Sequence, residues 1–165
     1  MRMSDKKPPR SFLIVNEQYI SDIASQEISK EVDAALSLLR NIKVPLVAFF
    51  GSARLTDDTL YVRYARKLAK TLGQKGYGII NGGGPGIMKA SSQGAMDAHT
   101  TSIALKAKML PAERINVRLA THELSFKWMF VRRFAMAIRA HASIFFPGGI
   151  GTLNEFYEYV MLMQN

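Results

Sequence analysis

The chain has 165 residues, 48% of them apolar, and a net charge of +9 at pH 7. This length and apolar content fit one domain with a real core and exclude a disordered chain. The absence of cysteine excludes disulfides, thiolate metal sites and cysteine nucleophiles, and no apolar run approaches the ~20 residues that a membrane span needs.

The basic N-terminal segment is not followed by the apolar stretch that a secretory signal requires. We therefore expect a soluble, cytoplasmic protein without a membrane partner. Positive charge is concentrated in residues 106–139, where eight basic and two acidic side chains give a net charge of +6. Such a patch suggests an anionic ligand, although a solvated surface explains it about equally well on its own.

The predicted elements begin with a charged, proline-containing segment over residues 1–16, which we expect to be a flexible arm. Over residues 18–41, apolar side chains recur at three- and four-residue steps and predict a helix. Four short, continuously apolar segments then predict buried strands, and segments of helical period separate most of them. The strands are expected at 44–50, 77–80, 102–105 and 143–146, and the helices at 59–75, 87–98, 125–141 and from 151 onward.

Strands that alternate with helices favour a doubly wound parallel sheet with helices on both faces and right-handed crossovers. Residues 106–124 show no clear period, so we expect a long loop there, and such loops are usually functional. Ligands of these sheets bind beyond the carboxyl ends of the strands. Three strands end in glycine turns that should therefore meet at one edge: Gly51-Ser52, Gly82-Gly83-Gly84 and Gly148-Gly149.

The most informative segment runs from Pro147 to Glu155, with the sequence Pro-Gly-Gly-Ile-Gly-Thr-Leu-Asn-Glu. A glycine-rich turn from a strand into a helix leaves backbone N–H groups uncovered, and the helix dipole adds about half a positive charge. We therefore predict a phosphate-binding site at this turn. Glu155 lies one turn into the helix, close enough to act on a group attached to the phosphate.

Other candidates carry alternatives that the sequence leaves open. The turn at 82–86 lacks the dinucleotide fingerprint, and it suits either close approach of a ligand or a tight turn. Of Arg132 and Arg133, we expect one to face the strand ends and the other to face solvent or a partner chain. Glu113 is either a second carboxylate of the site or an exposed loop residue. The histidines show no metal spacing.

Together these segments resemble the LOG family, which contains cytokinin riboside 5′-monophosphate phosphoribohydrolases and bacterial nucleotide 5′-monophosphate nucleosidases. Its members are often mislabelled as lysine decarboxylases. The resemblance covers roughly residues 44–163 and rests on the three glycine turns, the loop motif around Glu113, and the Arg132-Arg133 pair ahead of the Pro147 motif. Asn154 departs from the family, which often has an acidic residue there, and Arg133 stands where lysine is commoner.

The resemblance implies a Rossmann-like fold with an extra N-terminal helix. We therefore expect three parts: a flexible arm (1–16), a helical extension (17–43) and a nucleotide-binding catalytic domain (44–165). Family members continue with another strand and more helix, so we expect a chain truncated after Asn165 or a sheet edge that a partner completes. The family is usually dimeric, which implies a homodimer or a higher homo-oligomer with the site near the subunit contact.

The implied reaction is hydrolysis of the N-glycosidic bond of a nucleoside 5′-monophosphate, AMP-like or a cytokinin nucleotide, without metal or cofactor. Arg132 and Glu155 would be the catalytic pair. The 5′-phosphate would be held by Gly148, Gly149, Ile150, Gly151 and Thr152. Base and ribose would be lined by Ser52, Gly83, Gly84 and Met88, with Glu113 and Arg133 as further contacts.

Two other functions compete with hydrolysis. The same fold suits a non-catalytic carrier or sensor of a nucleotide or a molybdopterin-type phosphorylated ligand, because fold does not fix function. Nucleic-acid binding through the basic patch is disfavoured, because the aromatic residues have the spacing of buried side chains and no recognition motif is present.

Overall fold

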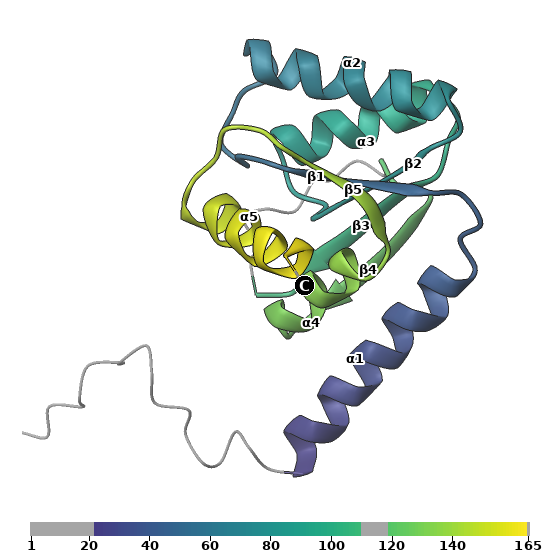
Figure 1. Cartoon of the computed structure of the whole chain (residues 1–165), viewed down its shortest axis with the longest axis vertical. Helices are drawn as coiled ribbons and strands as arrows, with labels where there is room; N and C mark the ends of the chain where they lie inside the picture. Colours follow the sequence, from purple (N-terminus) through teal and green to yellow (C-terminus); the bar gives the residue numbers. More distant parts are fainter. Residues whose placement is uncertain (1–21, 110–118, 165) are drawn as a thin grey trace, which may run out of the picture.

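The computed structural model describes residues 22–109 and 119–164. Within these ranges the chain forms a central sheet between two layers of helices (Figure 1). The helices are α1 (Asp22–Arg40), α2 (Leu60–Gln74), α3 (Ile87–Asp97), α4 (Met129–Ala137) and α5 (Ile150–Met163). The strands are β1 (Leu46–Phe50), β2 (Gly78–Asn81), β3 (Ser102–Ala107), β4 (His122–Phe126) and β5 (Ala140–Phe145).

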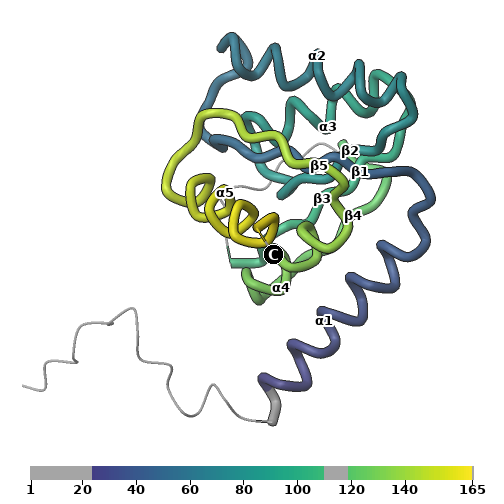
Figure 2. Tube along the Cα trace, viewed as in Figure 1, coloured from purple at the N-terminus to yellow at the C-terminus, as the bar shows by residue number. Residues whose placement is uncertain are grey.

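All strand pairs are parallel, and the order across the sheet is β4-β3-β2-β1-β5. The trace in Figure 2 leaves β1, steps outward through β2 and β3 to β4, and returns to pair β5 with the opposite side of β1. This confirms the predicted parallel α/β sheet with helices on both faces. The direction in which strands are added to the sheet reverses between β1 and β5, and folds of this kind bind ligands at such a point.

The two faces of the sheet are covered by different helices because side chains alternate along each strand. Val47 and Phe49 pack with α2 and α3, whereas Leu46 and Phe50 point to the opposite face and pack with α1, α4 and α5. The inner strands β1 and β2 are buried throughout, as their continuous apolar runs predicted.

The structure differs from the sequence prediction at β4, at both ends of α4, which ends at Ala137 and not at 141, and at the start of β5, which lies at Ala140 and not at 143. Residues 122–126, expected at the end of a loop and the start of a helix, form the edge strand β4, which pairs with β3 from Ile103 to Ala107. Its sequence His-Glu-Leu-Ser-Phe is largely exposed, so it lacks the apolar run that marks an inner strand. As a consequence, the helix predicted to start at Ser125 begins only at Met129.

Helix α1, predicted over 18–41, and the turn that follows it contact both ends of α4. The Glu31 carboxylate accepts hydrogen bonds from the backbone N–H groups of Lys127 (2.6 Å) and Trp128 (3.1 Å), where α4 begins. At the other end, Arg139 Nη2 donates to the Ile42 carbonyl at 2.6 Å. A carboxylate at a helix N-terminus also complements the dipole. Helix α1 therefore fixes the position of α4.

Tyr159 on α5 is buried against the rings of Phe50 (5.0 Å between centroids) and Phe145 (6.0 Å). Within the described part of the chain, its hydroxyl has no hydrogen-bond partner. Burial raises the pKa of Tyr159, and the Glu155 and Glu158 carboxylates add to the shift, which Arg132 opposes. An unpaired buried hydroxyl costs stability.

We therefore expect Tyr159→Phe to raise the free energy of unfolding by about 1 kcal/mol at neutral pH. Above about pH 10, Tyr159 ionises in the unfolded state but stays protonated when folded, so the wild type loses stability and the gain grows. Urea denaturation at both pH values checks this, with Tyr61→Phe on the exposed face of α2 as the control. A destabilised Tyr159→Phe variant would mean that the hydroxyl is paired.

Candidate functional site

A pocket of about 670 Å³ lies at the carboxyl ends of β1 and β5, where the strand order reverses. This volume falls in the range of small-molecule sites. Glycine turns from β1, β2 and β5 all reach it, as the sequence predicted. Its lining comprises Phe49, Phe50, Gly51, Ser52, Ala53, Arg54, Gly82, Met88, Met129, Arg132, Arg133, Gly149, Ile150, Gly151, Thr152, Asn154 and Glu155.

One wall of the pocket is the N-terminus of α5, a helix of 14 residues that begins after Gly149. No side chain caps this end, so the N–H groups of the first turn are left to other acceptors. A side chain built at Gly149 or Gly151 would meet no atom within 4 Å, so the space over both glycines is open. This geometry suits an anion seated on backbone amides.

Gly148 does not line the pocket, because Thr152 packs back over it. A Cβ at Gly148 would lie 2.2 Å from the Thr152 hydroxyl oxygen, so glycine allows the threonine to fold over the turn. Thr152 itself does line the pocket. Gly148 thus contributes to the predicted phosphate turn through the shape of the backbone.

The turn after β1 is tied to both of its neighbours through Ser52. Its N–H donates to the Pro147 carbonyl at 3.1 Å, and its carbonyl accepts from Ile87 N at 3.2 Å. The Ser52 hydroxyl accepts from Arg54 N at 3.0 Å. The carbonyl lies where a Cβ of Gly86 would be, 2.3 Å away, and Gly86 has a φ of 63°. These contacts lock the turns of β1, β2 and β5 together.

The β2–α3 turn is organised by Asn81, which is fully buried. Its Nδ2 group donates to the Met88 carbonyl (3.1 Å) and to the hydroxyls of Ser91 (3.0 Å) and Ser92 (2.9 Å). Its Oδ1 accepts from Gly83 N at 2.9 Å. The side chain thereby joins the strand end to the first turns of α3. Sequence reasoning missed this role, because an asparagine before a glycine turn gives no sign of burial.

Gly83 and Gly84, predicted to contact a ligand, do not line the main pocket. Gly83 has a φ of 69° and borders a separate small cavity beside the Lys106–Glu123 ion pair. Gly82, which was not singled out, is the glycine of this turn that reaches the pocket. Glu113 lies outside the described residues.

Arg132 is buried, 6% exposed, and extends from α4 into the pocket. Its Nε donates to the carbonyl of Leu105, near the end of β3, at 2.7 Å. This agrees with the expectation that one of the two arginines faces the strand ends. A buried guanidinium needs such acceptors because desolvation of an isolated charge is costly.

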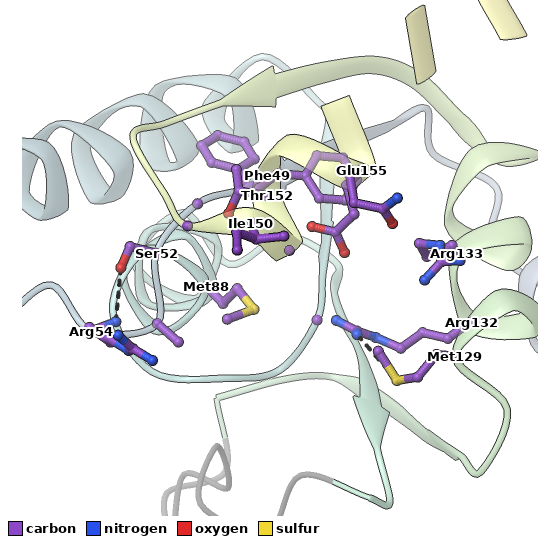
Figure 3. A pocket seen from close by; sticks show the side chains of 17 residues that line it. Phe49, Ser52, Arg54, Met88, Met129, Arg132, Arg133, Ile150, Thr152 and Glu155 are labelled. Carbon is purple, nitrogen blue, oxygen red and sulfur yellow. Dashed lines mark hydrogen bonds between the residues drawn. The ribbon is translucent and has the colours of Figure 1, made fainter. Parts of the chain in front are cut away.

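Glu155 is half-buried on α5 and reaches the pocket from the opposite wall. Figure 3 shows its carboxylate and the Arg132 guanidinium projecting into the same space and toward one another. Met88 lines the pocket too, and its sulfur lies beside the Arg132 guanidinium, since a Cβ built at Gly82 would meet both. The tertiary structure thus brings the two predicted catalytic side chains, 23 positions apart in sequence, to one pocket.

Arg133 is half-buried and does not point away from the site. Its Nε forms an ion pair with the Glu158 carboxylate at 2.7 Å, which links α4 to α5, and the residue also lines the pocket. Arg54 and Met129 line it as well, and sequence reasoning missed both. Arg54 follows the Gly51-Ser52 turn directly, and its position could have been noticed there. Met129 becomes visible only once α4 is placed.

Within residues 22–109 and 119–164, no cluster of His, Asp or Glu side chains has the makings of a metal site. Nor does any helix in these ranges have the length and apolar character to span a bilayer.

Comparison with known proteins shows similarity in sequence and in fold. Residues 88–165 match the family model described as "Possible lysine decarboxylase". The chain is 28% identical over 143 residues to the pyrimidine/purine nucleotide 5′-monophosphate nucleosidase of Escherichia coli K12, a match that covers 78% of this chain and 31% of that protein.

A rice protein (Oryza sativa subsp. japonica) named "Probable cytokinin riboside 5'-monophosphate phosphoribohydrolase LOGL3" is 32% identical over 117 residues, or 70% of this chain and 55% of that protein. The chain thus spans less than two thirds of both relatives. The fold superposes with a TM-score of 0.64 on the molybdenum cofactor binding protein of Rippkaea orientalis, at 18% identity over 74% of each chain. The resemblance to the LOG family is confirmed.

We expect Asn81→Leu to lower the free energy of unfolding by about 2–4 kcal/mol, because it removes the hydrogen bonds of the Asn81 side chain to the Gly83 N–H and to two buried hydroxyls. Urea denaturation measures the loss. The matched control is Asn41→Leu, which removes one exposed hydrogen bond at the end of α1 and should change stability by less than about 0.5 kcal/mol. Equal effects for the two variants would contradict the role of Asn81.

Proposed function

We propose, from the similarity of this chain to LOG-type relatives and to the family model described above, that it hydrolyses the N-glycosidic bond of a nucleoside 5′-monophosphate. The products are a free base and ribose 5-phosphate. One observation carries the proposal: Glu155 and Arg132 face one another in a pocket whose wall is the uncapped N-terminus of α5.

The 5′-phosphate is proposed to sit on the α5 turn, against the amides of Gly149 to Thr152. Charge supports a dianionic ligand. Arg54, Arg132 and Arg133 line the pocket, where the acidic residue is Glu155, and Glu158 offsets Arg133. The surplus of positive charge matches a phosphomonoester better than a neutral nucleoside.

Spacing along α5 supports the placement of the sugar. Glu155 follows Gly151 by four residues, a rise of about 6 Å along a helix at ~1.5 Å per residue. A phosphate over the first turn would therefore place the ribose beside the Glu155 carboxylate. Binding at the phosphate, remote from the bond to be broken, would orient the sugar and lower the barrier there.

The chemistry follows from these positions. Cleavage of the N-glycosidic bond builds positive charge on the ribose in an oxocarbenium-like transition state. The Glu155 carboxylate stabilises that charge and orients the attacking water, whose oxygen bonds to C1′ while its proton passes toward the departing base. Arg132 donates to phosphate or ribose oxygens and orients Glu155. No step calls for a metal or a redox cofactor.

Ser52 and Met88, which line the pocket, are proposed to contact the ribose and the base. The roles inferred for Gly83, Gly84 and Glu113 stay predictions, as does a preference for AMP-like or cytokinin bases. The relative from Escherichia coli is named for both purine and pyrimidine nucleotides. Binding that relies mostly on phosphate and ribose would be compatible with either base class.

We also propose that the chain works in the cytoplasm as a homodimer. Apolar side chains stay exposed on the neighbouring helices α4 and α5, which is unusual for a monomer surface. They include Phe130, Phe134, Ile138, Leu153, Met161 and Leu162. A second copy seated on these helices would cover them close to the pocket.

A carrier function is the second candidate, and one observation favours it: the superposition on the molybdenum cofactor binding protein of Rippkaea orientalis. A carrier would use the same amide-lined anion site, without turnover. Calorimetric titration with AMP, together with an assay for free base, separates the two functions. Binding without any release of base would favour the carrier.

We expect the wild type to release adenine from AMP, and Glu155→Gln to lower kcat by at least about 100-fold, since the carboxylate stabilises the transition state. Chromatography of the free base measures both rates. The control is Asp97→Asn, which removes a surface ion pair with Arg66 at the C-terminal end of α3. Activity that survives in Glu155→Gln would refute the role given to this residue.

A further inference from the structure

The Arg132 guanidinium is held before any ligand arrives. Its Nε is bonded to the Leu105 carbonyl at 2.7 Å, which fixes the plane of the group. The sulfur of Met129, one turn earlier on α4, lies 4.0 Å from Nη1. A buried arginine without such walls would sample several rotamers, because its side chain has four rotatable bonds.

The remaining wall is the backbone of Gly82. A Cβ built at this position would lie 2.0 Å from Arg132 Nη2 and 3.2 Å from Cζ, far inside van der Waals contact. It would also lie 2.8 Å from the Met88 sulfur. The guanidinium therefore occupies the space that any other residue at position 82 would fill with its own side chain.

Backbone strain does not explain this glycine. The glycines with positive φ among the described residues are Gly76, Gly83 and Gly86, so Gly82 has a conformation open to other residues. The turn can therefore form with alanine at position 82. What the position requires is the absence of a side chain on the face that meets Arg132.

We propose that Gly82 is a positioning residue of the site: together with the Leu105 carbonyl it forms a slot that seats the Arg132 guanidinium opposite Glu155. The proposal rests on the function proposed above and adds a group that acts through Arg132. Preorganised charge lowers a barrier because nothing has to reorient during the reaction. A displacement of about 1 Å can cost about 100-fold in rate.

Gly82→Ala is the direct test. The atoms that would overlap the new methyl group are the ends of flexible side chains, so the fold should survive while the guanidinium is displaced. We expect kcat for AMP to fall about 100-fold with a much smaller change in KM. Circular dichroism and the thermal midpoint should stay close to those of the wild type. An unchanged kcat overturns the proposal.

A double-mutant cycle separates positioning from a general structural effect. Arg132→Lys cannot reproduce the bond from Nε to the Leu105 carbonyl, so it should also lose activity. If Gly82 acts through Arg132, the double variant should be no slower than the slower single variant. Independent losses that multiply would overturn the proposal.

A spectroscopic readout tests the slot apart from catalysis. In the wild type, the Arg132 Nε–H proton should give a resolved resonance that exchanges slowly with water, because it is buried and bonded to the Leu105 carbonyl. Gly82→Ala should shift this resonance and speed its exchange. Gly151→Ala is the matched control, since its added methyl group meets no atom within 4 Å and should leave the resonance in place.

The two proposals fail differently. A resonance that Gly82→Ala leaves unmoved overturns the slot, even if AMP is hydrolysed. The resonance could also move as expected while the chain releases no base from AMP. That result would support the slot and overturn only the proposed hydrolytic function.

Discussion

The pocket depends on the pairing of β5 with β1. The chain builds its sheet outward from β1 to β4 and then places β5 on the opposite side of β1. Helices that follow β1 and β5 consequently diverge to opposite faces, and a cleft opens where the strands end. Had β5 paired with β4, the Gly149 turn would lie at the far edge of the sheet, away from Ser52 and Gly82.

Around this cleft, hydrogen bonds of buried polar groups hold the turns in fixed positions relative to one another. Asn81 joins β2 to α3, and Ser52 joins the turns of β1, β2 and β5. Each of these groups would cost free energy if its partners moved, so the turns cannot shift independently. A site that must hold an anion by its backbone amides needs this rigidity, because an amide cannot reach out as a side chain can.

The position of Arg132 depends on residues from several elements outside the pocket. Arg132 stands on α4, and the start of α4 is held by the Glu31 carboxylate from α1. Its guanidinium is then seated between the Leu105 carbonyl and Gly82. A helix outside the main sheet thus stabilises the position of a charge in the pocket. Tyr159, which lies near this site, is instead destabilising, because its buried hydroxyl has no hydrogen-bond partner among the described residues.

The sequence by itself determined the parallel α/β architecture, because the inner strands are continuously apolar and alternate with segments of helical period. It also determined the phosphate turn as a candidate, because a glycine turn before a helix has a direct local meaning. The pairing of Arg132 with Glu155 was implied by the resemblance to the LOG family. The edge strand β4 escaped prediction, since an exposed strand with polar side chains carries no burial signal.

Only the tertiary structure decided which glycine of the β2 turn reaches the pocket, that Arg133 pairs with Glu158, and that Asn81 is buried. Each of these depends on contacts between elements that are distant along the chain. The spacing of residues in a sequence fixes which side chains share a face of a helix or strand. It does not fix which of those faces meet, and the pocket is formed where they do.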